Sequence, residues 1–115
     1  MGHSLGAIVA LKQALAYHNK VKGIIQIAGR PKVDISHTNL RLLNIYASND
    51  KIAKPADYPN FKNNLPKDHQ CHVIEGGIHA YFGDYGVNGF DGKPTISQKS
   101  QTTQTVKLIL DFINA

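Results

Sequence analysis

The chain lacks several features that would place it in common structural classes. Its 115 residues include a single cysteine, Cys71, which excludes an internal disulfide. Cys71 belongs to a short, alternating apolar stretch, a position that favours a buried structural thiol over a reactive one. The sequence holds no apolar run of membrane-spanning length, no internal repeat and no low-complexity segment. We therefore expect one globular domain over residues 1–115, with 42% hydrophobic residues to build a modest core.

Charge of one sign is not concentrated anywhere in the sequence. The formal net charge is +5, but the 13 lysines and arginines are scattered, without a basic run or an aromatic-basic stripe. A solvated basic surface is therefore favoured over nucleic-acid binding. The sequence shows no signal peptide. Because the native amino terminus is expected to lie outside this sequence, the cellular compartment stays open.

Apolar runs separated by turn residues predict an α/β fold. Apolar residues at helical spacing predict a helix over residues 5–18. Three apolar runs predict buried strands, at Val21–Ala28, Leu42–Ala47 and Cys71–Ile74. Strands separated by helical segments imply right-handed crossovers. We expect a sheet of three parallel strands with flanking helices on both faces.

The second half of the chain carries weaker helical signals. Pro55–Leu65 is a short helical candidate interrupted by Pro59, and residues 80–97, which contain four glycines, predict a long loop. A carboxyl-terminal helix is expected from Ser97, which serves as its cap. The apolar face of this helix is expected to consist of Val106, Ile109, Leu110 and Ile113.

The most informative motif is Gly2-His3-Ser4-Leu5-Gly6, which matches the pattern Gly-x-Ser-x-Gly. This pattern is typical of a strained turn that presents a nucleophilic serine between a strand and a helix. The glycines at positions 2 and 6 are expected to prevent collisions where the strand and the helix meet, and Ala7 keeps the next contact small. Only Met1 precedes Gly2, so the sequence is expected to lack the strand that should lead into Ser4.

A nucleophilic serine needs a base, and the base needs an acid that orients it. In a parallel sheet such residues lie just beyond the carboxyl ends of strands. Asp50 follows the strand that ends at Ala47, and His79 follows the strand that ends at Ile74, after a flexible Gly-Gly pair. The order serine, aspartate, histidine is that of a known triad. Asp50 as a plain turn residue and His79 as an ordinary loop histidine remain the alternatives.

Other titratable residues fit the pattern less well. His3 is expected to point away from the nucleophile. Asp57 lies in the short helical candidate, and Asp68 precedes a strand and so faces the wrong edge of the sheet. Asp84 and Asp91 lie in the glycine-rich loop, where solvated turn carboxylates are favoured over a calcium site. The histidines show no metal-ligand spacing with a partner carboxylate.

These residues resemble the carboxyl half of a serine α/β-hydrolase. The elbow, Ser48-Asn49-Asp50 and the stretch from Ile74 to Gly86 are similar to a branch of small bacterial hydrolases related to the dienelactone-hydrolase-like group. The resemblance implies that Ser4 is the nucleophile, His79 the general base and acid, and Asp50 the residue that holds the imidazole. It also implies a Leu5 backbone N–H in the oxyanion hole, a small ester-type substrate, and no cofactor or metal.

The same resemblance implies that this sequence covers part of a larger fold. A partial sheet without its amino-terminal strands would leave an apolar edge available for self-association. In the family, the second oxyanion donor comes from a loop after an early strand, and losing one donor costs roughly a hundredfold or more in rate. We expect an isolated chain to hydrolyse esters poorly. The alternative is an inactive fragment that needs a complementary chain.

Overall fold

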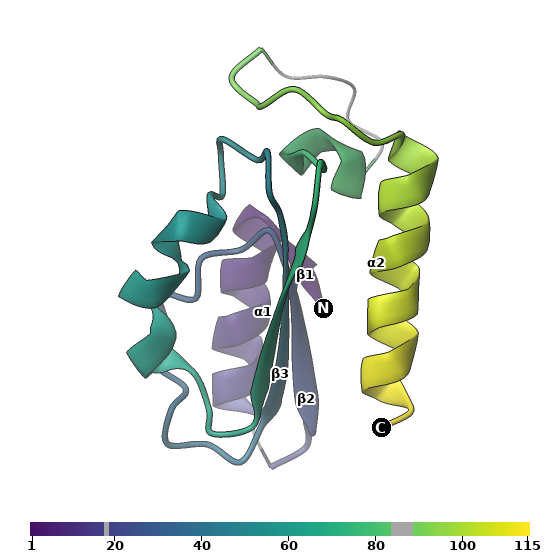
Figure 1. Cartoon of the computed structure of the whole chain (residues 1–115). Coiled ribbons are helices and arrows are strands. Elements are labelled where there is room, and N and C mark those ends of the chain that lie inside the picture. Colours follow the sequence, from purple (N-terminus) through teal and green to yellow (C-terminus); the bar gives the residue numbers. More distant parts are fainter. Residues whose placement is uncertain (18, 84–88) are drawn as a thin grey trace.

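A parallel sheet of four strands lies at the centre of the fold (Figure 1). The computed structural model describes residues 1–17, 19–83 and 89–115. Strands follow one another across the sheet in chain order, so each crossover joins two neighbours. The strands are β1 (Gly2–His3), β2 (Gly23–Ile27), β3 (Arg41–Ala47) and β4 (His69–Ile74).

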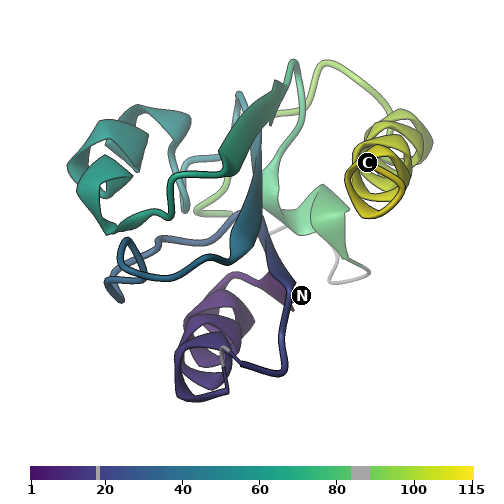
Figure 2. The ribbon, with the colours of Figure 1, turned by 90° about the horizontal axis from the view of Figure 1, so that it is seen from below.

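Helices cover both faces of this sheet. Helix α1 (Leu5–Ala16) and the 3-10 helices η1 (Pro55–Asn60) and η2 (Lys62–Asn64) lie on one face, and α2 (Gln98–Ile113) lies on the other (Figures 1 and 2). A further 3-10 helix, η3 (His79–Phe82), follows β4. None of the helices in the described ranges is long and apolar enough to cross a membrane.

Two apolar clusters hold the layers together. One packs α1 against the sheet and contains Leu11, Ala14, Ile24, Ile35, Leu40, Leu42 and Leu65. The other packs α2 against the opposite face and contains Ile25, Ile27, Leu43, Ile45, Ile74 and Phe112. Strand β3 contributes to both clusters, which explains its nearly continuous apolar sequence, because a parallel strand covered on both faces has no solvated side.

The prediction of three strands was wrong by one. Gly2 and His3 form a fourth strand, which pairs in parallel with Gln26 and Ile27 of β2. Two residues are too short for a periodic signal, so only the pairing with β2 defines β1 as a strand. The other three strands are confirmed with shifted ends, and β4 begins at His69, before the predicted Cys71.

The predicted helices are confirmed with differences at their ends. Helix α1 ends at Ala16, before the predicted end at residue 18, which lies outside the described residues. The Pro55–Leu65 candidate consists of two 3-10 turns, and Pro59 lies inside the first. The hydroxyl of Ser97 accepts the backbone N–H of Ser100, which confirms Ser97 as the cap of α2. In the predicted loop over residues 80–97, positions 84–88 also lie outside the description.

The predicted apolar face of α2 was largely wrong. Val106, Leu110 and Ile113 are about half exposed or more, whereas Phe112 packs against the sheet. Gln101 and Thr105 are buried on the side that faces the sheet. The helix therefore lies on the sheet through a face that includes polar residues with hydrogen-bond partners, which apolar spacing alone does not reveal.

Phe112 and Ile113 provide a direct test of how α2 is oriented. Phe112 is 6% exposed and its neighbour Ile113 is 61% exposed. We expect Phe112→Ala to lower the free energy of unfolding by about 3–5 kcal/mol, because the change removes a buried ring from the core. Ile113→Ala should change it by less than about 0.5 kcal/mol, as is usual for exposed positions. Urea denaturation of both variants measures the difference, and similar losses would contradict this orientation.

Candidate active site

Ser4 lies in a strained turn between β1 and α1. Its backbone has φ 55° and ψ −121°, a left-handed conformation that non-glycine residues rarely adopt. The Ser4 N–H donates a hydrogen bond of 3.0 Å to the Ile27 carbonyl oxygen, which continues the β1–β2 ladder into the turn. Pairing with β2 therefore supports the strained residue from one side, and α1 begins immediately after it.

Small residues allow this turn to form, although not all at the expected positions. A Cβ atom at Gly2 would lie 2.5 Å from the Gly6 carbonyl oxygen, so glycine is required there. A Cβ at Gly6 would meet nothing within 4 Å among the described atoms, so the expected collision at that position was wrong. Ala7 is fully buried. A Cβ atom added at Gly29 would lie 2.4 Å from the Cβ of Ala7. The helix thus packs closely against the loop after β2.

Asp50 lies in the turn after β3 and is 3% exposed. One carboxylate oxygen, Oδ1, accepts the backbone N–H groups of Ile52 at 2.7 Å and Ala53 at 2.8 Å. Its second oxygen, Oδ2, accepts Nδ1–H of His79 at 2.7 Å. A buried carboxylate with these three donors is fixed in orientation and compensated for its loss of solvent.

His79 connects Asp50 with Ser4. It is the first residue of η3, directly after the β4 turn, and is 8% exposed. Because Nδ1 faces a carboxylate, the neutral imidazole carries its proton there and leaves Nε2 as an acceptor. The Ser4 hydroxyl lies 3.1 Å from Nε2. The structure therefore brings the three predicted site residues into one hydrogen-bonded line, which suits proton transfer from the Ser4 hydroxyl to the imidazole.

The turn that carries His79 is tied to the neighbouring elements. Gln101 of α2 is fully buried and makes two hydrogen bonds with Ile78: its side-chain amide donates to the carbonyl oxygen, and its side-chain oxygen accepts the N–H. Gly76 has φ 81°, a conformation that explains the glycine at this position of the turn before His79. Its N–H donates to the Ser48 hydroxyl at 2.7 Å, which links this turn to the turn of Asp50.

His3 does not point away from the site, in contrast to the prediction. Its ring centroid lies 4.9 Å from that of His79 and 5.9 Å from that of Phe82. Burial lowers the pKa of His3 below its usual value, and the neighbouring His79 lowers it further, while Asp50 opposes both effects. The His3 ring therefore packs in a tilted arrangement beside the His79 imidazole, and its lowered pKa favours the neutral form.

Asp91 also differs from the prediction. It is 9% exposed rather than solvated, and its carboxylate accepts the backbone N–H groups of His79, Ala80 and Gly92. Asp84, the other carboxylate predicted for the loop, lies outside the described residues. Asp91 stands in a glycine-rich stretch without apolar periodicity, so no pattern in the sequence indicates that its side chain is buried.

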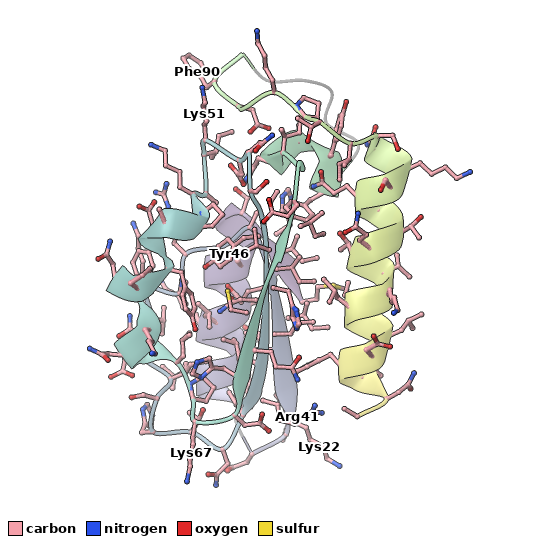
Figure 3. The ribbon with its side chains drawn as sticks, in the orientation of Figure 1. Lys22, Arg41, Tyr46, Lys51, Lys67 and Phe90 are labelled. Atoms are coloured by element: carbon pink, nitrogen blue, oxygen red, sulfur yellow. The ribbon has the colours of Figure 1, made fainter. Side chains whose placement is uncertain are left out.

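The two rival acids form ion pairs with arginines. Asp57 in η1 is paired with Arg30, and Asp68, which directly precedes β4, is paired with Arg41 of β3. Lys22, Arg41 and Lys67 mark the end of the sheet where Asp68 lies in Figure 3, whereas Lys51 and Phe90 mark the end where Asp50 lies.

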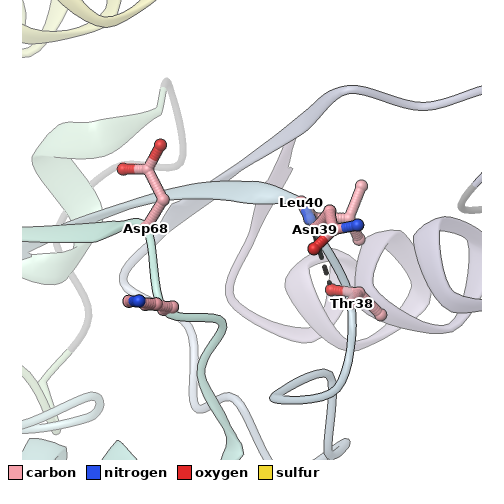
Figure 4. A pocket seen from close by; sticks show the side chains of 5 residues that line it. Thr38, Asn39, Leu40 and Asp68 are labelled. Atoms are coloured by element: carbon pink, nitrogen blue, oxygen red, sulfur yellow. Dashed lines mark hydrogen bonds between the residues drawn. The ribbon is translucent and has the colours of Figure 1, made fainter.

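A pocket of about 430 Å³ opens at the end of the sheet opposite Ser4 (Figure 4). Its lining residues are Thr38, Asn39, Leu40, Lys67 and Asp68. It lies before the amino ends of β3 and β4, so it is separate from the hydrogen-bonded line of Ser4, His79 and Asp50. Among the residues that the structure describes, no group of three or more His, Cys, Asp or Glu side chains could hold a metal ion.

The sequence matches a family model described as the alpha/beta hydrolase family over residues 1–103. The match covers most of the chain, which therefore belongs to this family of enzymes. No curated protein matches the sequence.

Solved structures share the fold at low sequence identity. An alpha-beta serine hydrolase homologue from Coxiella burnetii has a TM-score of 0.58 and 22% identity, over 71% of this chain and 40% of that one. A protein of unknown function from Agrobacterium tumefaciens, proposed to be an alpha/beta hydrolase, has a TM-score of 0.67 and 18% identity, over 98% and 49%. A predicted CIB-like hydrolase from Thermoplasma acidophilum gives 0.62 and 18%, over 95% and 48%. The chain thus spans half or less of the length of these structures.

The lowered pKa of His3 leads to a prediction on stability and pH. A histidine whose pKa is lower when folded stabilises the fold above its unfolded pKa of about 6.5, and this contribution is lost as pH falls through the folded value. The wild-type chain should therefore lose more stability between about pH 8 and about pH 5.5 than His3→Gln does. Urea midpoints at the two pH values measure this.

His37→Gln serves as the control, because it removes an exposed imidazole and should keep the pH dependence of the wild type. An equal loss of stability in wild type and His3→Gln would show that burial of His3 has no effect on its protonation.

Proposed function

We propose that this domain acts as a serine hydrolase on carboxylic ester-type bonds through a covalent acyl-enzyme. The observation that carries the proposal is the hydrogen-bonded line from the Ser4 hydroxyl through His79 to Asp50, at 3.1 Å and 2.7 Å. Membership of the alpha/beta hydrolase family, a family of enzymes, supports it. Ser4 is the nucleophile in this proposal, His79 is the general base and acid, and Asp50 orients the imidazole.

In the acylation step, the Ser4 oxygen forms a bond to the carbonyl carbon of the ester. The hydroxyl proton moves to Nε2 of His79, and the imidazolium is stabilised by the Asp50 carboxylate, which stays ionised. The carbonyl oxygen becomes an oxyanion. When the carbon–oxygen bond to the leaving group breaks, the proton on Nε2 passes to the departing alcohol, and an acyl group remains on Ser4.

The oxyanion is the species that needs the strongest stabilisation. Leu5 follows Ser4 as the first residue of α1, where backbone N–H groups have no partner within the helix. We assign the Leu5 N–H as one oxyanion donor, because it adjoins the nucleophile and lies at the positive end of the helix dipole. Deacylation repeats the sequence with water, whose proton moves to Nε2 before the acid is released.

The segment between Ser4 and Asp50 bears on the size of the acyl group that the site would accept. Between Ser4 and Asp50 the described residues form α1, β2, β3 and their connections, without an inserted domain that could cover the serine. This favours a small acyl group in an open site over a long chain beneath a lid. Ester, thioester and amide carbonyls can all react by the same steps, because a triad does not select the acyl group.

Labelling with a fluorophosphonate tests whether Ser4 is activated. An activated serine attacks the phosphorus and becomes covalently modified, whereas an ordinary hydroxyl does not. We expect stoichiometric modification of the peptide that contains Ser4, measured by mass spectrometry. Asp50→Asn should slow labelling on the order of 10⁴-fold, because an amide at this position favours the wrong tautomer of His79.

Two serine variants make this experiment specific. Ser4→Ala should abolish labelling. Ser36→Ala should leave it unchanged, because Ser36 is exposed and its hydroxyl donates to Asp34 instead of a histidine. A folded wild-type chain that stays unlabelled, or that is labelled equally after Ser4→Ala, would contradict the proposed nucleophile.

A second candidate function is supported by the edge of the sheet. Strand β1 pairs with only two residues of β2, Gln26 and Ile27, while β2 begins at Gly23. A groove beside this edge is lined by Met1, Gly6, Val9, Ala10, Gln13, Ala14, Val21, Gly23 and Ile24. The chain could therefore serve as part of an assembled hydrolase with no catalysis of its own. Labelling that occurs only after a complementary chain is added would favour this candidate.

A further inference from the structure

The carboxylate of Asp91 holds the backbone that carries His79. Its Oδ1 lies 3.3 Å from the His79 nitrogen and 2.8 Å from the Gly92 nitrogen, and its Oδ2 lies 2.9 Å from the Ala80 nitrogen. Both oxygens therefore act as acceptors for backbone N–H groups. Since Asp91 is 9% exposed, these three donors replace most of the water that an exposed carboxylate would bind.

The residues that follow Asp91 contact the turn that carries Asp50. The side-chain amide of Asn49 donates to the Lys93 carbonyl oxygen at 2.9 Å. Gly92 packs so closely on this turn that a Cβ atom there would lie 1.7 Å from the Asn49 carbonyl oxygen. The segment 91–93 therefore contacts both the residue before Asp50 and the backbone of His79. It spans the two turns whose separation sets the distance between His79 Nδ1 and Asp50 Oδ2.

The chemistry of the contact requires a carboxylate. An ionised aspartate offers two acceptor oxygens and no donor, which matches a site lined by three N–H groups. An asparagine of the same shape has one oxygen and one NH₂ group. In either orientation its NH₂ group would face a backbone N–H, either that of Ala80 or those of His79 and Gly92, and leave buried donors without acceptors.

We propose that Asp91 is a positioning residue of this site: its carboxylate fixes the backbone of His79, and the attached segment 91–93 keeps the imidazole aligned between Asp50 and Ser4. This inference rests on the proposed hydrolase function for its effect on rate, but the alignment of His79 can be measured without any substrate. Asp91 acts through His79 and takes no part in bond making or breaking.

The test compares Asp91→Asn with the wild-type chain by two readouts. The first is the fluorophosphonate labelling rate of Ser4, which should fall roughly 10- to 100-fold, as is typical when a supporting hydrogen bond is lost. The second is the proton resonance of His79 Nδ1–H, which reports its hydrogen bond to Asp50. We expect this resonance to shift or broaden in the variant, while the circular dichroism spectrum stays that of the folded chain.

Asp111→Asn is the matched control, because it makes the same change on an exposed position of α2 and should alter neither readout. If Asp91→Asn does not fold, Asn49→Ala tests the same link, since it removes the bond to the Lys93 carbonyl oxygen. It also removes the hydrogen bond that the Ser48 hydroxyl donates to Asn49 Oδ1, within the turn of Asp50. We expect this variant to fold, to label several-fold more slowly and to show an altered resonance.

The outcomes separate this inference from the proposed function. A resonance that stays unchanged in the folded variant overturns the positioning role of Asp91, whatever the labelling rate. A wild-type labelling rate in that variant overturns it as well. A wild-type chain that is never labelled contradicts the hydrolase proposal, while the shift of the resonance in Asp91→Asn would still support the positioning role.

Discussion

Parallel pairing of the four strands is the constraint on which the site depends. The carboxyl ends of parallel strands meet at one edge of the sheet, so the residues after β1, β3 and β4 converge there. Ser4, Asp50 and His79 occupy these three positions. Strand β1 is the shortest, with two residues, and it leads directly into Ser4, whose backbone is strained by a positive φ. The arrangement therefore depends on the hydrogen bond that the Ser4 N–H donates to the Ile27 carbonyl oxygen.

Polar contacts join the turns at the end of the sheet that carries the site. The Asn49 N–H donates to the Gly77 carbonyl oxygen, and the Ser48 hydroxyl accepts the Gly76 N–H, so the turns of the acid and the base are bonded directly. Gln101 then fixes Ile78 to α2, and Asp91 fixes His79 to the segment 91–93. Each contact satisfies a buried donor or acceptor, and together they limit how far the imidazole can move.

Much of the site could be predicted because its signals are local. The Gly-x-Ser-x-Gly pattern and the positions of Asp50 and His79 after apolar runs are visible in the sequence. The alignment of the three side chains in one line follows from the sheet. Asp91 could not be found in this way, because its burial comes from contacts of the segment 91–93 with the turns that carry His79 and Asp50, which no local pattern indicates. The orientation of α2 was also hidden, since buried Gln101 and Thr105 break the apolar pattern and Val106 and Leu110 are exposed.

The fold was predictable in class, but not in the number of strands. Three strands carry enough apolar residues to be recognised, whereas Gly2–His3 is identified only by the ladder it forms with β2. Gly6 shows the opposite case, since the motif predicts a close contact that the described atoms do not contain. In both cases the outcome depends on which residues lie nearby in space, and the local sequence pattern does not show this.

We propose that the line of Ser4, His79 and Asp50 activates the serine for acyl transfer. The most direct measurement is the mass of the Ser4 peptide after the chain is mixed with p-nitrophenyl acetate and quenched. We expect an acetyl group on Ser4 in the wild-type chain and none in Ser4→Ala. A folded chain that remains unacetylated, with the His79–Asp50 hydrogen bond intact, would contradict it.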